Sequence, residues 1–297
     1  MLTRPHAMQE IGFVLRQTRL LDGVVLSCWE REGPGPTCVM VHGMADSAAI
    51  WKATVENIGL NCRLLLPDLP GHGYSAWLHE DDYTCAGLAN VLIRQLRGLD
   101  VDECILIGHS LGAAVCLEMH KTEAIGISGL AFLDYNPFLG IEAVMRLFDI
   151  FSKSFRTYQT REDFVGSLLN VLPRMRVDVA QGLFDNCLKP APGGGFVSQA
   201  DPAILQILRH LSHHYTLDPD LNRVFRSLLR GITCPSLIVR GAHSALLSKD
   251  TAMEMINTIT FPAIYREVPE TGHAIPLEQP GPLARILSDF IGSALST

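Results

Sequence analysis

The stretch that decides the fold runs from Glu103 to His120 and reads ECILIGHSLGAAVCLEMH. Its first part, ECILI, is a short apolar run typical of a buried strand, and its last part, AAVCLEMH, predicts a helix. Between them lies the pattern G-x-S-x-G, with Ser110 at its centre. Small residues are needed at positions 108 and 112 because the serine of such a pattern sits on a cramped turn. We therefore interpret this segment as a nucleophile elbow.

Short runs rich in Val, Ile and Leu recur on both sides of the elbow, most of them bounded by Gly, Pro or Asp. Helical patterns lie between several of them, with Leu and Ile at helix spacing over residues 88–99 and again over 283–291. Strands that alternate with helices predict an α/β fold, with a mostly parallel sheet covered on both faces. The Asp22-Gly23 step predicts a hairpin, so the first two strands are expected to be antiparallel. The predicted strands are residues 24–29, 37–41, 63–66, 104–107, 129–133, 237–240 and 264–268.

The strand pattern stops at about Phe138 and returns after Gly231. Between these positions Leu, Phe and Met recur at helical intervals, separated by breakers such as Pro173 and the segment 190–195. This pattern predicts a helical insertion within the sheet domain. No period of about 20–50 residues recurs, which argues against a repeat architecture.

The composition is that of a globular protein, because 47% of the 297 residues are hydrophobic and only 19% are charged. Acidic residues outnumber basic ones by 31 to 24, and the basic residues are scattered. Nucleic acid and anionic membrane surfaces are therefore poor partners, and the expected partner is a small-molecule substrate. A homodimer is left open.

The segment Met1–Gln9 lacks the pattern of a secretion signal, and no run reaches the ~18 apolar residues of a membrane span. We expect a cytoplasmic protein. The eight cysteines form no C-x-x-C pair, so most are expected to be buried apolar side chains in a reducing compartment, not zinc ligands or disulfides.

His42-Gly43-Met44 follows the strand at 37–41, at the edge of the sheet where the elbow also lies. The backbone N–H groups of Met44 and Leu111 are placed to form an oxyanion hole. The Met44 side chain is expected to line the pocket. His42 is expected to hold the loop through hydrogen bonds, and we also place it among the residues that border the pocket.

Gly272-His273 follows the strand at 264–268 and precedes a helix opened by Pro280 and Pro282. The chain order is nucleophile and then histidine, as an elbow protein requires. We therefore expect His273 to act as the general base for Ser110.

Five segments fall together in the order and spacing of the α/β-hydrolase superfamily, which this chain resembles along nearly its whole length. The resemblance implies an α/β-hydrolase core of residues 1–137 and 232–297, with a helical cap domain of residues 138–231 over the site. It gives structural roles to Asp68, Gly71 and Gly73, and we expect Phe138, Leu139 and Met145 near the pocket entrance. The segments are VHGM (41–44), PDLPGHGYS (67–75), GHSLG (108–112), CPSLIVRGAHSALLS (234–248) and PETGHAIPLEQP (269–280).

The catalytic acid departs from the family pattern. Relatives commonly carry Asp in a segment RGA-x-S-D, where this chain has Ala245. Asp134, at the end of the strand at 129–133, resembles the alternative acid position of some members, including certain haloalkane dehalogenases. We expect Asp134 to orient His273, and the competing interpretation is that it braces the turn before the cap. Asp250 is expected to provide first-turn charge on a helix.

The remaining candidates indicate no metal and no cofactor. His210, His213 and His214 share a helical face, but no acidic or cysteine partner is spaced to complete a metal site. Gly193–Gly195 lacks the strand and the Lys-Ser/Thr of a phosphate-binding loop, and no dinucleotide fingerprint occurs.

These residues predict a serine hydrolase that acts on a small carboxylic ester or related acyl compound through an acyl-enzyme. Serine in place of Asp at the elbow argues against dehalogenase or epoxide-hydrolase chemistry, which in this fold uses a carboxylate nucleophile. Two alternatives remain open: hydrolytic carbon–carbon cleavage of a diketone-type substrate, and a weakly active or non-catalytic protein that binds a small ligand.

Overall fold

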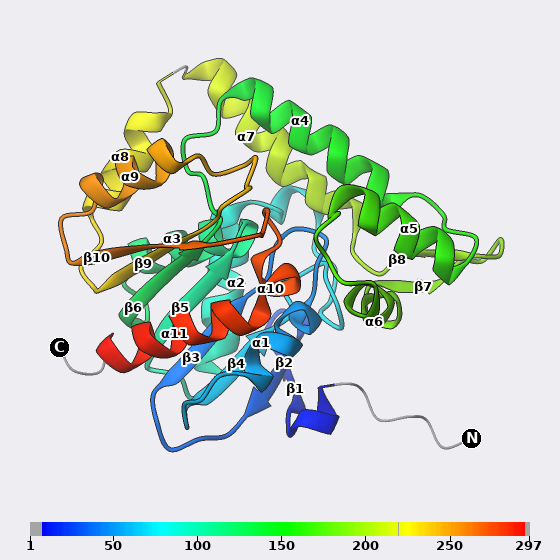
Figure 1. Ribbon diagram of the computed structural model, residues 1–297, viewed down its shortest axis with the longest axis horizontal. Helices are drawn as coiled ribbons and strands as arrows, with labels where there is room; N and C mark the ends of the chain where they lie inside the picture. The colour runs from blue at the N-terminus through cyan, green and yellow to red at the C-terminus, as the bar shows by residue number, and fades with distance from the viewer. Residues whose placement is uncertain (1–7, 219, 295–297) are drawn as a thin grey trace.

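A single eight-stranded sheet organises the computed structural model, which describes residues 8–218 and 220–294 (Figure 1). β1 pairs with β2, and β2 with β4, in antiparallel fashion, whereas all other neighbours are parallel. The predicted α/β fold with a mostly parallel sheet is confirmed. From one edge to the other the strands are β1 (Val14–Arg19), β2 (Val25–Arg31), β4 (Arg63–Pro67), β3 (Thr37–Val41), β5 (Glu103–His109), β6 (Gly126–Leu133), β9 (Ser236–Gly241) and β10 (Ala263–Val268).

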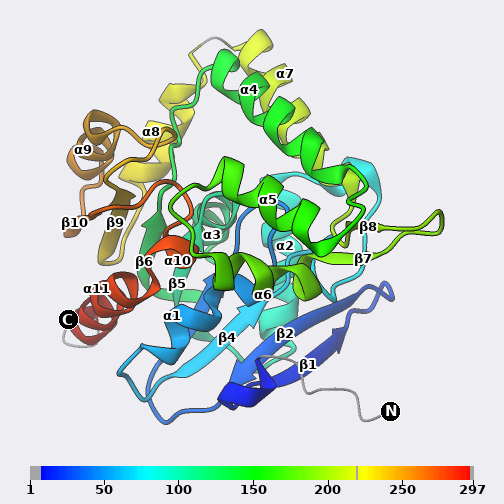
Figure 2. The same cartoon turned by 45° about the vertical axis from the view of Figure 1, so that its right-hand side comes forward.

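Helices cover both faces of this sheet (Figures 1 and 2). Cys104 and Leu106 of β5 belong to one core cluster, whereas Ile105 and Ile107 belong to the other. Because both faces are buried, the strand reads as one continuous apolar run with no polar alternation. The first cluster is covered by α2 (Cys85–Arg97), α3 (Leu111–Thr122) and α9 (Lys249–Thr258), and the second by α1 (Lys52–Glu56), α10 (Ile275–Glu278) and α11 (Pro280–Ala294).

A mostly helical insertion joins β6 to β9. In both views α4 and α7 lie side by side above the sheet (Figures 1 and 2). The helices are α4 (Ile141–Ser152), α5 (Arg161–Val171), α6 (Val177–Cys187), α7 (Gln206–Leu217) and α8 (Asn222–Arg230), and the short 3₁₀ turns of the chain are Gln9–Ile11, Ala48–Trp51, Glu80–Asp82, Lys153–Phe155 and Pro202–Leu205.

The insertion also contains an antiparallel pair that the sequence pattern did not predict, β7 (Leu188–Pro190) and β8 (Phe196–Ser198). Strands of three residues are too short to show an alternating pattern. The glycine run between them forms the turn, with Gly194 at φ 93° and Gly195 at φ 74°. Only glycine adopts such angles without strain, which gives this run a structural role.

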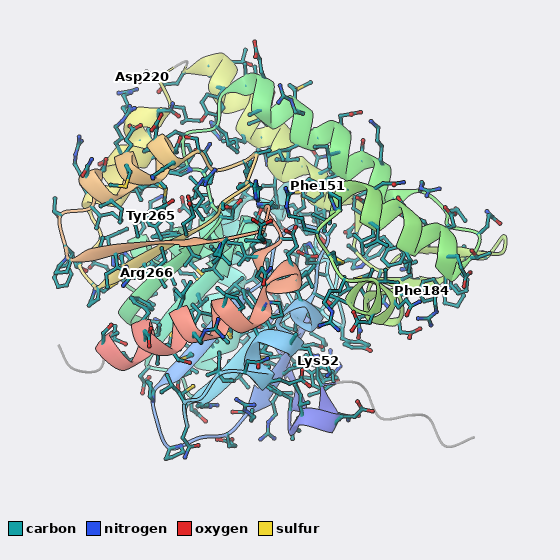
Figure 3. All side chains as sticks on the ribbon, viewed as in Figure 1. Lys52, Phe151, Phe184, Asp220, Tyr265 and Arg266 are labelled. Atoms are coloured by element: carbon teal, nitrogen blue, oxygen red, sulfur yellow. The ribbon has the colours of Figure 1, made fainter. Side chains whose placement is uncertain are left out.

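The insertion is tied to the sheet domain by a buried polar contact. Tyr83, which is fully buried, donates a hydrogen bond from its hydroxyl to Asp201 Oδ2 at 2.8 Å, and the Asp201 N–H donates to the Gly71 carbonyl at 2.8 Å. Phe151 and Phe184, labelled in Figure 3, pack onto the two core clusters from the insertion side. The insertion is therefore held against the core by both apolar and polar contacts.

All eight cysteines are free, and six of them are buried. Within residues 8–218 and 220–294, no helix combines the length and the apolar character needed to cross a bilayer.

Candidate active site

Ser110 lies on the turn between β5 and α3. Its backbone has φ 53° and ψ −117°, a conformation that costs a non-glycine residue about 1–3 kcal/mol. The turn is held because the Ser110 N–H donates to the Leu133 carbonyl of β6 at 3.1 Å. A Cβ on Gly112 would lie 2.2 Å from the Val41 carbonyl oxygen, and one on Gly108 would lie 2.4 Å from Ala113 Cα. Close packing of helix against strand therefore explains both glycines of the G-x-S-x-G pattern.

His273 and Asp134 are brought together from distant parts of the chain. Nδ1 of His273, in the loop between β10 and α10, lies 2.8 Å from Oδ2 of Asp134, which directly follows β6. Asp134 is fully buried, whereas the His273 side chain is 29% exposed. Because an ionised carboxylate only accepts, we assign the imidazole proton to Nδ1, which leaves Nε2 free to accept a proton. Within the described residues no hydrogen bond joins Ser110 to this imidazole, a contact that often tightens only when substrate binds.

Asp134 has two further donors from the loop after β9. Its Oδ1 accepts from the Gly241 N–H at 3.0 Å, and its Oδ2 accepts from the Ser244 hydroxyl at 2.5 Å. The same hydroxyl oxygen accepts from the N–H groups of Leu246 and Leu247. The loop that contains Ala245 therefore reaches the site, with Ser244 as a donor beside the exposed Ala245.

Two residues that the sequence analysis did not select hold the His273 loop. Nε2 of His109 donates to the His273 carbonyl oxygen at 2.9 Å, and burial, aided by the charge of His273, lowers the pKa of His109 to about 3. Glu278 is buried and accepts from the Thr271 hydroxyl at 2.9 Å and the Gly272 N–H at 2.6 Å. No sequence signal marks His109, whereas Glu278 falls one turn after the histidine in the quoted PETGHAIPLEQP segment.

The two expected oxyanion donors have no hydrogen-bond partner among the described residues. Leu111 is the first residue of α3, so its N–H also lies at the positive end of a helix. Met44 is buried on the loop after β3, and the next residue, Ala45, has φ 60°. The Ala45 N–H donates to Nε2 of His72 at 3.1 Å, so a fully buried histidine fixes this loop. His72 is a further residue that the sequence analysis missed.

His42 holds the loop and does not border a pocket. Nδ1 donates to the Gly43 carbonyl oxygen at 2.8 Å, and Nε2 accepts from the Leu69 N–H at 3.0 Å. The side chain is 0% exposed, and burial lowers its pKa well below the usual value. The expectation that His42 borders the pocket is wrong, because both ring nitrogens and the whole ring surface are already engaged.

Asp68 braces the loop behind the site, as expected. Its two carboxylate oxygens accept from the N–H groups of Ala48 and Tyr74, at 2.8 and 3.0 Å. Burial raises its pKa to about 6. A Cβ on Gly73 would lie 2.2 Å from the Asp68 carboxyl carbon, and Gly71 has φ 77°, so both glycines are needed for this turn.

The residues expected near the pocket entrance occupy different environments. Phe138 and Leu139 are partly buried against the first core cluster, and the Arg226 guanidinium lies 5.1 Å from the Phe138 ring centroid. Met145 on α4 is 55% exposed. Their contact with substrate stays a prediction.

A separate groove of about 280 Å³ lies between α1, α6 and α10, and neither Ser110 nor His273 lines it. Its lining is mostly apolar and also includes Lys52, Glu56 and Asp178.

In the insertion, His213 and His214 are exposed on α7, and the described residues contain no group of three or more His, Cys, Asp or Glu arranged to hold a metal ion.

Residues 38–286 match the family model described as the alpha/beta hydrolase family. The chain belongs to this family. A pimeloyl-[acyl-carrier protein] methyl ester esterase of Vibrio vulnificus (strain CMCP6) is 34% identical over 136 residues, which are 46% of this chain and 51% of the esterase. This match therefore spans about half the length of the relative. The putative carbamate hydrolase RutD of Serratia proteamaculans (strain 568) is 28% identical, with 72% of this chain and 73% of the relative covered.

Two solved structures share the fold along nearly the whole chain or all of it. The crystal structure of E-2-(acetamidomethylene)succinate hydrolase superposes with a TM-score of 0.81 at 22% identity, covering 94% of this chain and 99% of the other. The esterase Rv0045c from Mycobacterium tuberculosis gives a TM-score of 0.71 at 19% identity, with 100% of both chains covered. At sequence identities of 22% and 19%, the structural similarity is evidence for the fold alone.

Proposed function

We propose that this protein is a serine hydrolase that cleaves a small carboxylic ester or related acyl compound through an acyl-enzyme. The observation that carries the proposal is the 2.8 Å contact between His273 Nδ1 and a fully buried Asp134, at the end of the strand beside the Ser110 elbow. A carboxylate at this position selects the tautomer in which Nε2 can accept the serine proton.

The proposed mechanism uses this chain's own groups at every step. His273 removes the proton from Ser110 Oγ, which attacks the carbonyl carbon, and the N–H groups of Met44 and Leu111 stabilise the oxyanion. The imidazolium then protonates the leaving group, and the acyl group stays on Ser110. A water molecule that gives a proton to His273 attacks the acyl carbon, which releases the acid and regenerates the hydroxyl.

The relatives support the reaction class without fixing the substrate. One is named as a methyl ester esterase and another as a putative carbamate hydrolase, and both names describe cleavage at a carboxylic or carbamic carbonyl. Because the match to the esterase covers about half of that protein, we extend to this chain only the class of bond and not the pimeloyl substrate.

The test is a panel of chromogenic esters of increasing acyl length, measured for the wild type, Ser110→Ala and the control Ser293→Ala. We expect hydrolysis of short esters by the wild type and the control, and a loss of several orders of magnitude in Ser110→Ala. Ser110-dependent cleavage of a diketone without ester hydrolysis would point instead to carbon–carbon hydrolysis. Ligand binding with no turnover of either substrate class would point to a non-catalytic protein.

A further inference from the structure

Asp46 lies in the candidate active site, and the proposed mechanism does not use it. It is half-buried, on the loop that follows β3, two residues after Met44. The position that a Cβ of Gly43 would occupy is 3.2 Å from Asp46 Oδ2, 3.4 Å from Ser110 Cβ and 3.1 Å from His109 Nδ1. The Asp46 carboxyl group and the side chain of the nucleophile therefore border the same small region of space.

Within the described residues, this carboxyl group has no hydrogen-bond donor and no Lys or Arg partner. Asp68 and Asp134, in contrast, accept two and three hydrogen bonds respectively. Burial raises the pKa of Asp46 to about 7, and the charge of His273 opposes this rise. A carboxylate that is partly withdrawn from water and has no protein donor gains an interaction when a donor is supplied from outside the chain.

The neighbouring histidines do not supply that donor. The N–H of His109 is committed to the His273 carbonyl oxygen, and its Nδ1 is buried with no partner among the described residues. The Nδ1–H of His273 is committed to Asp134. Neither histidine therefore supplies a free N–H group to the Asp46 carboxyl group.

The charge of the same carboxyl group also acts on a residue of the insertion. Burial raises the pKa of the Cys187 thiol, at the end of α6, and the charge of Asp46 adds to this rise. The charge of Asp46 therefore interacts with both the His273 imidazole and Cys187 of the insertion. An acyl group attached to Ser110 would start near this carboxyl group, because Ser110 Cβ and Asp46 Oδ2 border the same position at Gly43.

We propose that Asp46 is a substrate-selecting residue, whose carboxyl group accepts a hydrogen bond from an N–H or O–H group that the substrate carries close to its scissile carbonyl. This inference rests on the proposed function, because Ser110 defines which carbonyl is attacked. The substrate class is a hydroxyacyl or N-acylaminoacyl ester. Acyl groups that carry a carboxylate at the same place are disfavoured, since they would set two negative charges together.

The test uses two pairs of p-nitrophenyl esters in which one donor is replaced by an isosteric apolar group. The 3-hydroxybutanoate is compared with the 3-methylbutanoate, and the N-acetylglycinate with the 4-oxopentanoate. Rates are corrected for spontaneous hydrolysis and measured at about pH 8, where Asp46 is mostly ionised. The proteins are the wild type, Asp46→Leu, Asp46→Asn and the control Asp81→Asn, which changes an exposed carboxylate.

We expect the wild type and the control to favour the donor ester of at least one pair by about tenfold or more in kcat/KM, as a hydrogen bond to a charged acceptor provides. In Asp46→Leu that ratio should fall to within about twofold of unity. In Asp46→Asn, which keeps a neutral acceptor, it should fall at least about threefold.

A ratio near unity in the wild type, or an equal ratio in the wild type and either Asp46 variant, overturns the inference while the proposed function stands. If Asp46→Leu does not fold, the Asp46→Asn comparison decides alone. Failure of the proposed function has a different result: no ester of either pair is hydrolysed in a Ser110-dependent manner, and both proposals then fall.

Discussion

Asp134→Asn separates a catalytic from a structural carboxylate. Asp134 accepts three hydrogen bonds, from Gly241, Ser244 and His273, and it is fully buried. An asparagine has one acceptor oxygen and one donor group. If the amide nitrogen replaced Oδ1, it would face the Gly241 N–H, a buried donor–donor contact that costs about 1–3 kcal/mol.

The opposite orientation avoids this cost but changes the imidazole. The Asn nitrogen then faces His273 Nδ1 and also the Ser244 hydroxyl, whose two lone pairs already accept from the Leu246 and Leu247 N–H groups. Nδ1 must lose its proton and Nε2 must carry it, so the imidazole can no longer accept a proton from Ser110. We therefore expect kcat to fall by about 10⁴, equivalent to about 5.5 kcal/mol of activation free energy.

The assay is kcat on the best chromogenic ester, with thermal unfolding of the same preparations. Ser244→Ala is the matched control, because it removes one donor to Oδ2 and keeps the carboxylate; we expect a loss of about tenfold or less. In the Asp134→Asn background, Ala245→Asp should restore part of the rate. The reasoning is refuted if Asp134→Asn lowers only the unfolding temperature and leaves kcat within about tenfold, or if Ala245→Asp alone raises wild-type kcat a hundredfold.

Three further predictions concern the insertion, the Asp46 carboxyl group and the His273 loop. Phe138→Ala and Met145→Ala should change the kcat/KM ratio between short and long acyl esters by about 1–3 kcal/mol per methylene at most, which is roughly 10- to 200-fold, and an unchanged profile would place the pocket elsewhere. In urea unfolding, the wild type should lose stability relative to Asp46→Asn as the pH rises from 3.8, the usual pKa of an aspartate, to about 7. The reason is that the pKa of Asp46 is raised in the folded state, so ionisation of this carboxyl group favours the unfolded chain. Parallel pH curves for the two proteins would contradict this prediction. Glu278→Ala should lower kcat about tenfold, with a smaller loss in Glu278→Gln, and equal activity of both variants with the wild type would show that Glu278 does not position His273.

The elements that depend on local pattern could be predicted from the sequence. Both faces of β5 are buried and a helix packs closely against its end, so ECILI and the glycines of GHSLG carry a strong signal. The hairpin at Asp22-Gly23 forms because Gly23 adopts φ 89°. Each of these features is encoded within a few consecutive residues.

The residues that could not be predicted act through contacts between distant segments. His72 fixes Ala45 from another loop, and His109 holds His273 from across the sheet. The expected place of His42 at the pocket is wrong, because burial of the whole ring depends on how the loops around Leu69 pack. Asp46 belongs to no recognised sequence motif, and its carboxyl group comes close to the nucleophile only when the chain is folded.

Covalent labelling of Ser110 by a fluorophosphonate probe, followed by peptide mass spectrometry, tests the central claim most directly. A serine activated by His273 attacks phosphorus much faster than an ordinary hydroxyl group. We predict one adduct on the peptide that contains Ser110, lost in Ser110→Ala and strongly slowed in His273→Ala. Folded wild-type protein that stays unlabelled, or labelling that survives Ser110→Ala, would contradict the account.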